Sequence, residues 1–294
     1  MNLNSAGHSI LHLFEMISDM MGPTPPKAAS FIVTIYGDVV EPRGGVLWMG
    51  NLIEVCGHFG ISESLVRTAV SRLVNAGQLV GEREGRRSYY RLTKEARSEY
   101  LEAARVLFGP ASQTSGFKFL FNLSEDKEKQ AQSLGFVSIG QGGWIGPDRG
   151  TTEGLVSGAV GFAASPEQNS PALHHFLAER WDLKSYADQY EAFIGRCQPL
   201  GKRIDGELQL EGATALHLRL AMVHAFRAIL LKDPRLPAEF LPEDWAGERA
   251  FRLFAKLYRF LSEAADLYIG RVFEDRNGNL PSVTDAVRKR LANL

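Results

Sequence analysis

The chain of 294 residues has only two cysteines, Cys56 and Cys197, and they lie far apart in the sequence. Two distant thiols exclude a framework of disulfide bonds and are typical of the reducing cytoplasm, where each is expected to be a small buried residue. The sequence also lacks an apolar run long enough to cross a membrane. Its first 22 residues contain no Lys or Arg, unlike a secretory signal peptide. We therefore expect a cytoplasmic protein with no membrane partner.

An overall excess of positive charge, which is common in nucleic-acid-binding proteins, is missing too. Lys and Arg together number 33 against 34 Asp and Glu, and the formal net charge is −1. Any basic surface must therefore be local. One such segment is present, because the 34 residues from Gly60 to Thr93 contain six arginines and only three carboxylates.

Proline and glycine divide the N-terminal third of the chain into short elements. The three prolines of GPTPPK (22–27) separate a leading amphipathic helix from the remainder of the chain. Hydrophobic periodicity and turn residues then predict helices over about 28–40, 47–59, 62–76 and 94–107, with a β-hairpin between the last two whose turn is GRR (85–87). Helix, helix, turn, helix and hairpin is the order of a winged helix-turn-helix.

The rest of the chain changes character twice. Strand-like segments at 116–123, 136–146 and 154–164, with a charged helix after the first, predict a ferredoxin-like α+β domain. From about Ala172 onward the pattern is helical almost throughout. We therefore expect an α+β protein with four segments: an N-terminal helical arm and linker (1–26), a winged helix-turn-helix domain (27–110), a ferredoxin-like middle domain (111–171) and a mainly helical domain for dimerisation and effector sensing (172–294).

The helix predicted over 62–76 has two unlike faces. An apolar stripe, expected to pack on the preceding helix, consists of Leu65, Val66, Ala69, Val70 and Leu73. The opposite face has only hydrogen-bond donors and no carboxylate: Ser64, Arg67, Thr68, Ser71, Arg72 and Asn75. Arg binds guanine O6 and N7 together, Asn binds adenine in the same way, and Ser or Thr bonds a base or a phosphate. The face therefore predicts contact with a DNA major groove, whereas a merely solvated face would normally carry Glu and Lys.

Further predicted DNA contacts flank this face. Ser62 is the expected N-cap of the helix, where free N–H groups and the helix dipole favour a phosphate. The hairpin adds Arg83, Arg86, Arg87, Ser88 and Tyr89. A wing of this composition lies along the phosphate backbone or inserts an arginine into the minor groove, and it would supply much of the salt-dependent binding. A solvated turn is the alternative interpretation.

Three stretches carry a resemblance to a known family. Residues 47–93, from LWMGN to YYRLT, strongly resemble the N-terminal domain of the PaaX-type repressors of bacterial phenylacetate degradation. SLGFVSIGQGGWIGP (133–147) is similar to the family's middle domain, and residues 222–261 resemble its C-terminal domain. The resemblance implies a homodimeric repressor that binds double-stranded operator DNA and releases it when phenylacetyl-coenzyme A binds.

The family's middle domain in turn resembles the fold of the CRISPR-associated Cas2 nucleases. Those nucleases have an aspartate at the end of the first strand, where this chain has Asn122. Nuclease chemistry is therefore not expected. No local motif for a Ser-His-acid or Cys-His nucleophile and no set of metal ligands stands out, so we expect no catalytic residue, no metal and no resident cofactor.

The residues that would bind the effector are predicted less directly. GRCQPLGKR (195–203) is a basic cluster that would suit the phosphates of coenzyme A, although a solvated loop would look the same. His217 and His224 lie seven residues apart and could converge on a ligand, although partly exposed members of a packed helix have the same spacing. The predicted effector-binding set is Trp144, Arg196, Lys202, Arg203, His224 and Arg227.

Dimerisation is expected because DNA half-sites about 34 Å apart need two recognition helices related by a two-fold axis. A candidate interface is the apolar stripe Phe251, Phe254, Leu257, Tyr258 and Leu261, although an intramolecular core has the same pattern. Three alternative functions remain open at this point. They are a regulator that responds to a different acyl-coenzyme A, an acyl-coenzyme A enzyme with an attached DNA-binding domain, and a module whose wing binds another protein or RNA.

Overall fold

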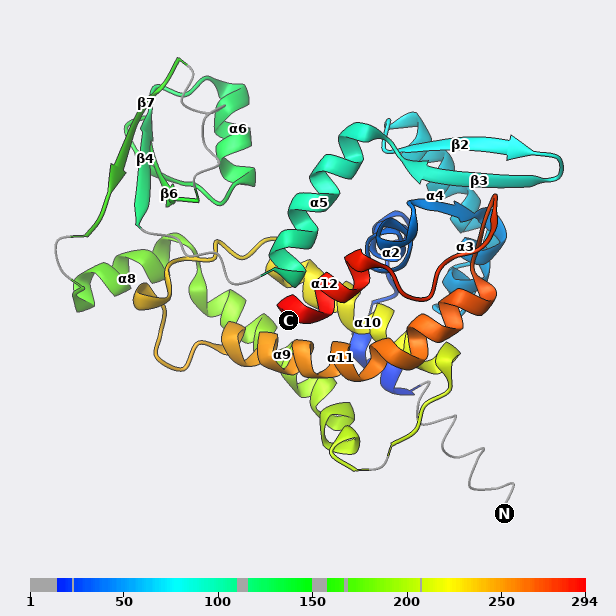
Figure 1. Ribbon diagram of the computed structural model, residues 1–294. Coiled ribbons are helices and arrows are strands. Elements are labelled where there is room, and N and C mark those ends of the chain that lie inside the picture. Colours follow the sequence, from blue (N-terminus) through cyan, green and yellow to red (C-terminus); the bar gives the residue numbers. More distant parts are fainter. Residues whose placement is uncertain (1–14, 23, 110–115, 150–157, 167–168, 207) are drawn as a thin grey trace. The chain divides into compact units, whose positions relative to one another are not determined.

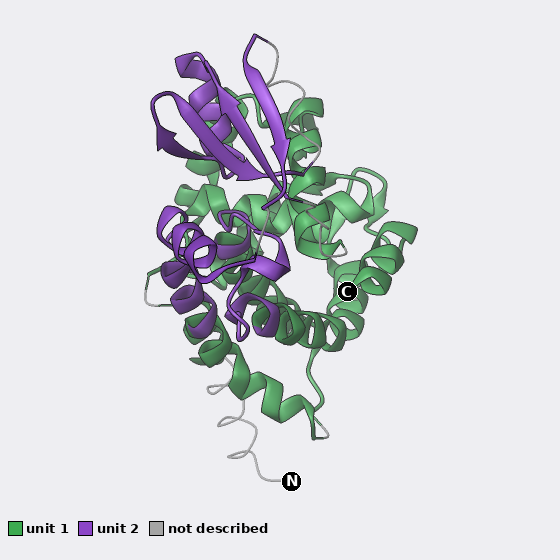
Figure 2. Cartoon of the chain, turned by 90° about the vertical axis from the view of Figure 1, so that its left-hand side faces the viewer, with its two compact units in different colours: residues 1–110, 192–228, 250–294 green, residues 111–191, 229–249 purple. Residues whose placement is uncertain are grey.

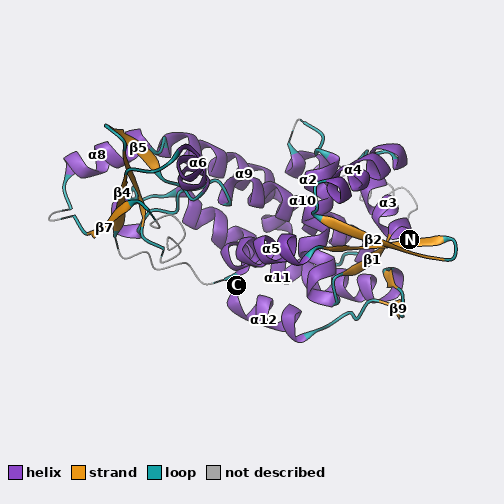
Figure 3. Cartoon of the chain, turned by 90° about the horizontal axis from the view of Figure 1, so that it is seen from above, coloured by secondary structure: helices purple, strands orange, loops and turns teal. Residues whose placement is uncertain are grey.

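The computed structural model describes residues 15–22, 24–109, 116–149, 158–166, 169–206 and 208–294. In these residues the chain combines many helices with three small antiparallel sheets, which confirms the α+β class (Figures 1 and 3). None of the described helices is both long and apolar enough to cross a membrane.

The chain forms two compact units (Figure 2). Unit 1 consists of residues 1–110, 192–228 and 250–294, and unit 2 consists of residues 111–191 and 229–249. The last part of the chain therefore returns to the unit that contains the predicted DNA-binding segment. The four segments predicted from the sequence stay a prediction.

The N-terminal elements of unit 1 have the predicted order, with one difference. They are α2 (Ala28–Ile35), continued by a π-helical turn (Tyr36–Val40), then β1 (Val46–Trp48), α3 (Met49–Gly57), α4 (Glu63–Asn75), β2 (Leu79–Glu84), β3 (Arg87–Leu92) and α5 (Lys94–Phe108). The helix that the sequence predicted to begin at about residue 47 begins at Met49. Residues 46–48 form a strand instead, because they pair antiparallel with β3 and complete a sheet of order β1-β3-β2.

Local signals fix the ends of α4. The Ser62 hydroxyl accepts a hydrogen bond from the Leu65 backbone N–H and so caps the first turn. Gly77 lies just after the helix with φ +68°, a left-handed conformation that favours glycine and ends the helix. The hairpin turn is shorter than predicted, since Arg87 already pairs with Glu84 in the β2–β3 ladder.

The later elements that lie wholly or mostly in unit 1 are α9 (Leu183–Ile204), α10 (Gly212–Leu230), α11 (Ala246–Val272), β8 (Glu274–Asp275), β9 (Gly278–Asn279) and α12 (Asp285–Asn293). The first residues of α9 and α11 and the last two of α10 belong to unit 2. Phe254, Leu257, Tyr258 and Leu261 of α11 are all buried within the chain. The Phe254 ring stacks on Phe226 at 4.5 Å between centroids. Of the two interpretations of this stripe, the structure supports the intramolecular core, which these four side chains help to form.

A buried charge cluster joins α10, α11 and α12 to the π-helical turn. The Asp38 carboxylate accepts hydrogen bonds from Arg219 Nε and from the Tyr258 hydroxyl, both at 2.8 Å. Arg219 Nη1 also donates to Asp266 at 2.7 Å, and Arg290 Nη1 donates to the Asp38 carbonyl oxygen at 3.1 Å. These bonds link the C-terminal helices to the N-terminal part of unit 1. Loss of one partner would leave a buried charge without compensation, which is strongly destabilising.

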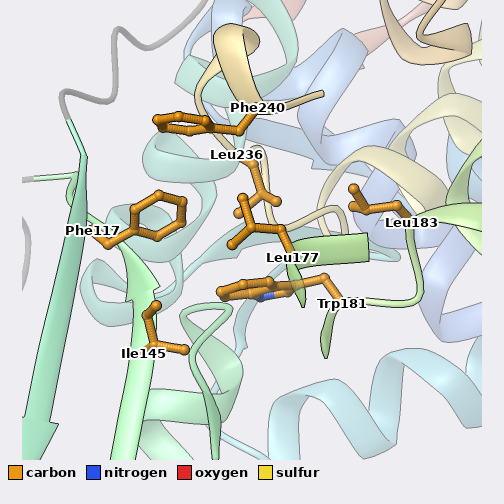
Figure 4. Close-up of a cluster of buried hydrophobic side chains, with 7 residues drawn as sticks. All are labelled: Phe117, Ile145, Leu177, Trp181, Leu183, Leu236 and Phe240. Atoms are coloured by element: carbon orange, nitrogen blue, oxygen red, sulfur yellow. The ribbon is translucent and has the colours of Figure 1, made fainter. Parts of the chain in front are cut away.

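Unit 2 contains β4 (Phe117–Phe121), α6 (Glu125–Ser133), β5 (Val137–Gly140), β6 (Gly143–Pro147), β7 (Val160–Ala164) and α8 (Pro171–Arg180). Its four strands lie in the order β5-β6-β4-β7, and every neighbouring pair is antiparallel. The main core of the unit is a cluster of Phe117, Ile145, Leu177, Trp181, Leu183, Leu236 and Phe240 (Figure 4). The first residues of the last predicted strand, 154–157, lie outside the described residues, as do residues 10–14 of the predicted leading helix.

Candidate nucleic-acid interface

A groove of about 470 Å³ lies between α4 and the β2–β3 hairpin. Its lining comes from α4 (Arg67, Val70, Ser71 and Val74), from the hairpin (Gly81, Glu82, Arg83, Ser88 and Tyr90) and from Met49 of α3. The structure thus brings predicted residues of the helix and of the hairpin to the same hollow surface.

The outer face of α4 is polar and exposed, as predicted. All six predicted residues on it are exposed: Ser64, Arg67, Thr68, Ser71, Arg72 and Asn75. Val66, Ala69, Val70 and Leu73 are buried on the opposite side. Leu65 was wrongly assigned to the buried stripe, because its side chain is 55% exposed. It lies about 100° around the helix from Val66, at the margin of the stripe.

Arg67 is held by a carboxylate one helical turn before it. Its Nε lies 2.8 Å and its Nη2 lies 2.7 Å from Glu63 Oε1, and both side chains are more than half exposed. Glu63 was not among the residues predicted from the sequence, although the spacing i, i+4 was the available signal. The pair orients Arg67 along the helix, and its guanidinium would have to leave Glu63 to bind another group with the same N–H donors.

The first turn of α4 uses several of its hydroxyl groups internally. Ser62 Oγ lies 3.1 Å from Ser64 Oγ, and the Thr68 hydroxyl donates to the Ser64 carbonyl oxygen at 2.8 Å. Ser62 is thereby fixed as the N-cap, and Thr68 is tied to its own helix.

The arginines of the hairpin fall into two groups. Arg83 lies opposite Ser88 in the ladder, lines the groove and donates from Nε to the Gly85 carbonyl oxygen at 3.2 Å. Arg86 is exposed at the turn. Arg87 instead stacks its guanidinium over the Trp48 ring, 4.5 Å from the centroid, and forms an ion pair with Glu274. Its side chain is therefore already engaged within the protein.

Tyr89 was predicted as a DNA contact, but it is only 6% exposed. Successive side chains of a strand point to opposite faces, and Tyr89 shares its face with Trp48 and Glu82, away from the face of Leu47 and Tyr90. The neighbouring Tyr90 lines the groove instead. The backbone of Tyr90 is also fixed, since the Tyr36 hydroxyl donates to its carbonyl oxygen at 3.0 Å.

The short β8–β9 hairpin from the C-terminal part of the chain contacts this region, and the sequence contained no local signal of it. Glu274 binds Arg87 across a separation of 187 residues, and Arg276 forms an ion pair with Glu82. The Asn51 side chain donates to the Val272 carbonyl oxygen at 3.0 Å and accepts from the Glu274 N–H at 2.8 Å. These bonds fasten the end of α11 to α3 and to the hairpin.

The predicted effector residues are divided between the two units. Trp144 belongs to unit 2, where it is buried in a cluster with Leu120, Ala131 and Phe136. The other five belong to unit 1. In α9, Arg196 and Arg203 are half-buried and Lys202 is exposed.

His224 and Arg227, one turn apart on α10, both contact α2. His224 Nδ1 lies 2.8 Å from the Thr34 hydroxyl, and Arg227 Nη2 donates to the Ser30 carbonyl oxygen at 3.2 Å. Burial, together with nearby Arg227, lowers the pKa of His224 to about 4. A cavity beside Arg227 has a volume of only about 10 Å³, which is room for a single water molecule.

His217 does not converge with His224 on a shared ligand. It is buried against His58, with 4.1 Å between ring centroids, whereas His224 packs against Phe31. The expectation that both histidines are partly exposed was therefore wrong for His217. Burial, with His58 beside it, lowers the pKa of His217 to about 4.

Cys56 and Cys197 are both buried, as predicted, and burial raises the pKa of each thiol to about 12. Neither thiol is therefore activated at neutral pH. In the part of the chain that the structure describes, no three His, Cys, Asp or Glu side chains are grouped so as to hold a metal ion.

Comparison with known proteins gives matches over nearly the whole chain. A family model described as PaaX-like protein matches residues 27–96, and one described as PaaX-like protein C-terminal domain matches residues 181–271, so that together they cover more than half of the chain. The transcriptional repressor PaaX of Escherichia coli (strain K12) is 29% identical over an alignment of 308 positions, which covers 96% of this chain and 95% of that protein. Among solved structures, the uncharacterized protein Rv0674 from Mycobacterium tuberculosis matches with a TM-score of 0.45 and 20% identity, over 74% of this chain and 89% of its own.

Proposed function

Since the chain belongs to the family of PaaX-like proteins, we propose that it is a transcriptional repressor of phenylacetate catabolic genes. The observation that carries the proposal is the groove between α4 and the β2–β3 hairpin, which has arginines and hydroxyl groups on both walls. The likeness to a transcriptional repressor over 96% of the chain supports the same function for the whole protein.

In this proposal, α3, α4 and the hairpin act as a winged helix-turn-helix. The order of the elements and the three-stranded β1-β3-β2 sheet support that assignment. Unit 2 is proposed to have the ferredoxin-like arrangement. Its antiparallel strand order β5-β6-β4-β7, with α6 between the first two strands along the chain, supports this.

The groove accounts for how both kinds of DNA contact are made at once. α4 enters the major groove with its exposed face, where Arg67, Arg72 and Asn75 bind base edges. Arg86 at the tip of the wing reaches the backbone or the minor groove of the same duplex. The phosphate backbone that separates the two DNA grooves then lies along the protein groove, where Ser71 and Ser88 offer hydroxyl donors.

Arg87 and Tyr89 take different roles from those first assigned to them. The ring of Trp48 and the carboxylate of Glu274 hold Arg87, so it positions the wing rather than binding phosphate. Tyr89 is buried on the sheet face that carries Trp48, opposite to the face of Tyr90.

Two recognition helices require a homodimer. The stripe on α11 is buried within the chain, so the dimer has to use another surface. The effector is proposed to be phenylacetyl-coenzyme A, with the basic residues Arg196, Lys202 and Arg203 as candidate partners of its phosphates. To move the protein from almost fully bound to almost fully released, the effector must prefer the released geometry by about 5.5 kcal/mol.

The test is fluorescence-anisotropy binding to the DNA upstream of the protein's own gene cluster, at fixed salt. We expect affinity about a thousandfold above that for scrambled DNA, lost on addition of phenylacetyl-coenzyme A but not of free phenylacetate. Tight binding that ignores the thioester would overturn the effector and leave the repressor. Equal binding to both DNAs would overturn the repressor itself.

A further inference from the structure

Leu65 is the one apolar side chain that α4 exposes on its first turn. The turn is otherwise polar, with Ser62, Glu63 and Ser64 all exposed. Leu65 is 55% exposed, although leucine is among the residues that proteins most often bury. Its helix is well capped and its stripe is well packed, so the exposure is not a consequence of fraying.

A second apolar group lies beside it. Thr68 is three residues further along the helix, so the two side chains are neighbours on the surface of α4. The Thr68 hydroxyl is turned back to the Ser64 carbonyl oxygen at 2.8 Å. The hydroxyl is therefore already hydrogen-bonded within the helix. The methyl group is the remaining group of this exposed side chain that can contact a partner.

We propose that Leu65 and the methyl group of Thr68 together recognise the C5-methyl group of a thymine in the major groove. The inference rests on the proposed function, because it requires α4 to enter DNA. It adds to that function an apolar contact that helps to select the DNA sequence, on a helix face whose other residues bind DNA through hydrogen bonds.

The chemistry of the DNA supports this assignment. The thymine C5-methyl is the distinctive apolar group that base pairs present in the major groove, and side chains such as Ala, Thr and Phe recognise it by contact. Residues near the N-terminus of a recognition helix are the ones that reach base edges. Leu65 is in this position, and burial against a methyl group would remove its exposed apolar surface from water.

The experiment replaces thymine by deoxyuridine, which removes only the methyl group. A tight-binding duplex is first selected from random sequences with the wild-type protein. Each of its thymines is then replaced in turn, and the affinity is measured by fluorescence anisotropy. We expect at least one position at which the wild type loses about fourfold in affinity, the effect of exposing one methyl-sized group.

Three variants assign that loss to the proposed side chains. Leu65→Ala is expected to bind the thymine and uracil duplexes equally at that position. Thr68→Ser keeps the hydroxyl and its bond to Ser64, and it is expected to reduce the difference. Leu101→Ala, which truncates a leucine on α5 that is also about half exposed, is the matched control and should keep the full difference.

The outcomes separate this inference from the proposed function. If the wild type prefers the selected duplex but tolerates uracil at every position, the thymine contact is overturned and the repressor stands. The same holds if Leu65→Ala keeps the fourfold difference. If no duplex can be selected above scrambled DNA, the proposed function fails and this inference fails with it.

Discussion

Replacing Arg67 by alanine should reduce the preference of the protein for one DNA sequence far more than its affinity for DNA in general. In the free protein the guanidinium lies 2.7–2.8 Å from the Glu63 carboxylate, and both side chains are more than half exposed. Opening such an exposed pair costs about 0.3–0.5 kcal/mol. A bidentate contact of arginine with guanine contributes about 1–3 kcal/mol of discrimination. The exchange is therefore favourable, and Arg67→Ala should lower the ratio of specific to random affinity by about 5- to 150-fold.

Glu63→Gln provides a test with the opposite sign. It removes the competing carboxylate and keeps Arg67, so affinity for the specific duplex should rise by about twofold, the value of the lost pair. Both variants are measured by competition anisotropy at fixed salt, with specific and scrambled duplexes in parallel, and thermal unfolding serves as the control for folding. Equal loss of both DNAs in Arg67→Ala would refute the assignment of base reading to this residue.

Other parts of unit 1 can be tested in the same way. Arg86→Ala should weaken the binding of specific and random DNA alike and reduce the slope of log affinity against log salt by about 0.9. The control Arg105→Ala on α5 should leave that slope unchanged. Equal slopes for the two variants would contradict the wing assignment. Asp38→Asn should lower the free energy of unfolding in urea by about 3–5 kcal/mol at neutral pH, because Arg219 is left without one of its buried partners, and a loss below about 1 kcal/mol would count against the buried cluster. The pKa of His217 is lowered to about 4 in the folded state. Its contribution to stability is therefore present above pH 6.5 and is lost as the pH falls toward 4. In urea unfolding, the free energy of unfolding of His217→Gln should fall less between pH 7 and pH 4.5 than that of the wild type.

Local chemistry made α4 predictable almost to the residue. A serine that caps the first turn and a glycine that ends the helix are signals within a few residues of the structure they determine. The side chains at the margin of the apolar stripe were not predictable in the same way. Leu65 lies one step around the helix from Val66, and only the position of the packed neighbours decides which of the two is covered.

Strand register was a second limit. Tyr89 and Tyr90 are adjacent and chemically alike, so either could have faced inward. The register with β1 assigns the faces: Tyr90 lies opposite Leu47 and Tyr89 opposite Trp48. Because β1 was taken for the start of a helix, this register was not available from the sequence. An alternating pattern therefore predicts the hairpin but not which of its two tyrosines lines the groove.

Contacts between distant parts of the chain were the least predictable. The stripe on α11 has the same sequence pattern whether it covers a core or a partner. Its Phe254 ring packs against Phe108 and Phe226, which are far away in the sequence. Similarly, the ion pair of Arg87 with Glu274 spans 187 residues, so no window of the sequence could have shown that Arg87 is occupied.

The central claim is that α4 and the β2–β3 hairpin form the surface that binds DNA. Hydrogen–deuterium exchange of the full chain, with and without a tightly bound duplex, tests this claim most directly. We expect slower exchange of backbone amides in residues 62–76 and 81–90 when the duplex is present. Unchanged exchange in both segments, with protection elsewhere in the chain, would contradict it.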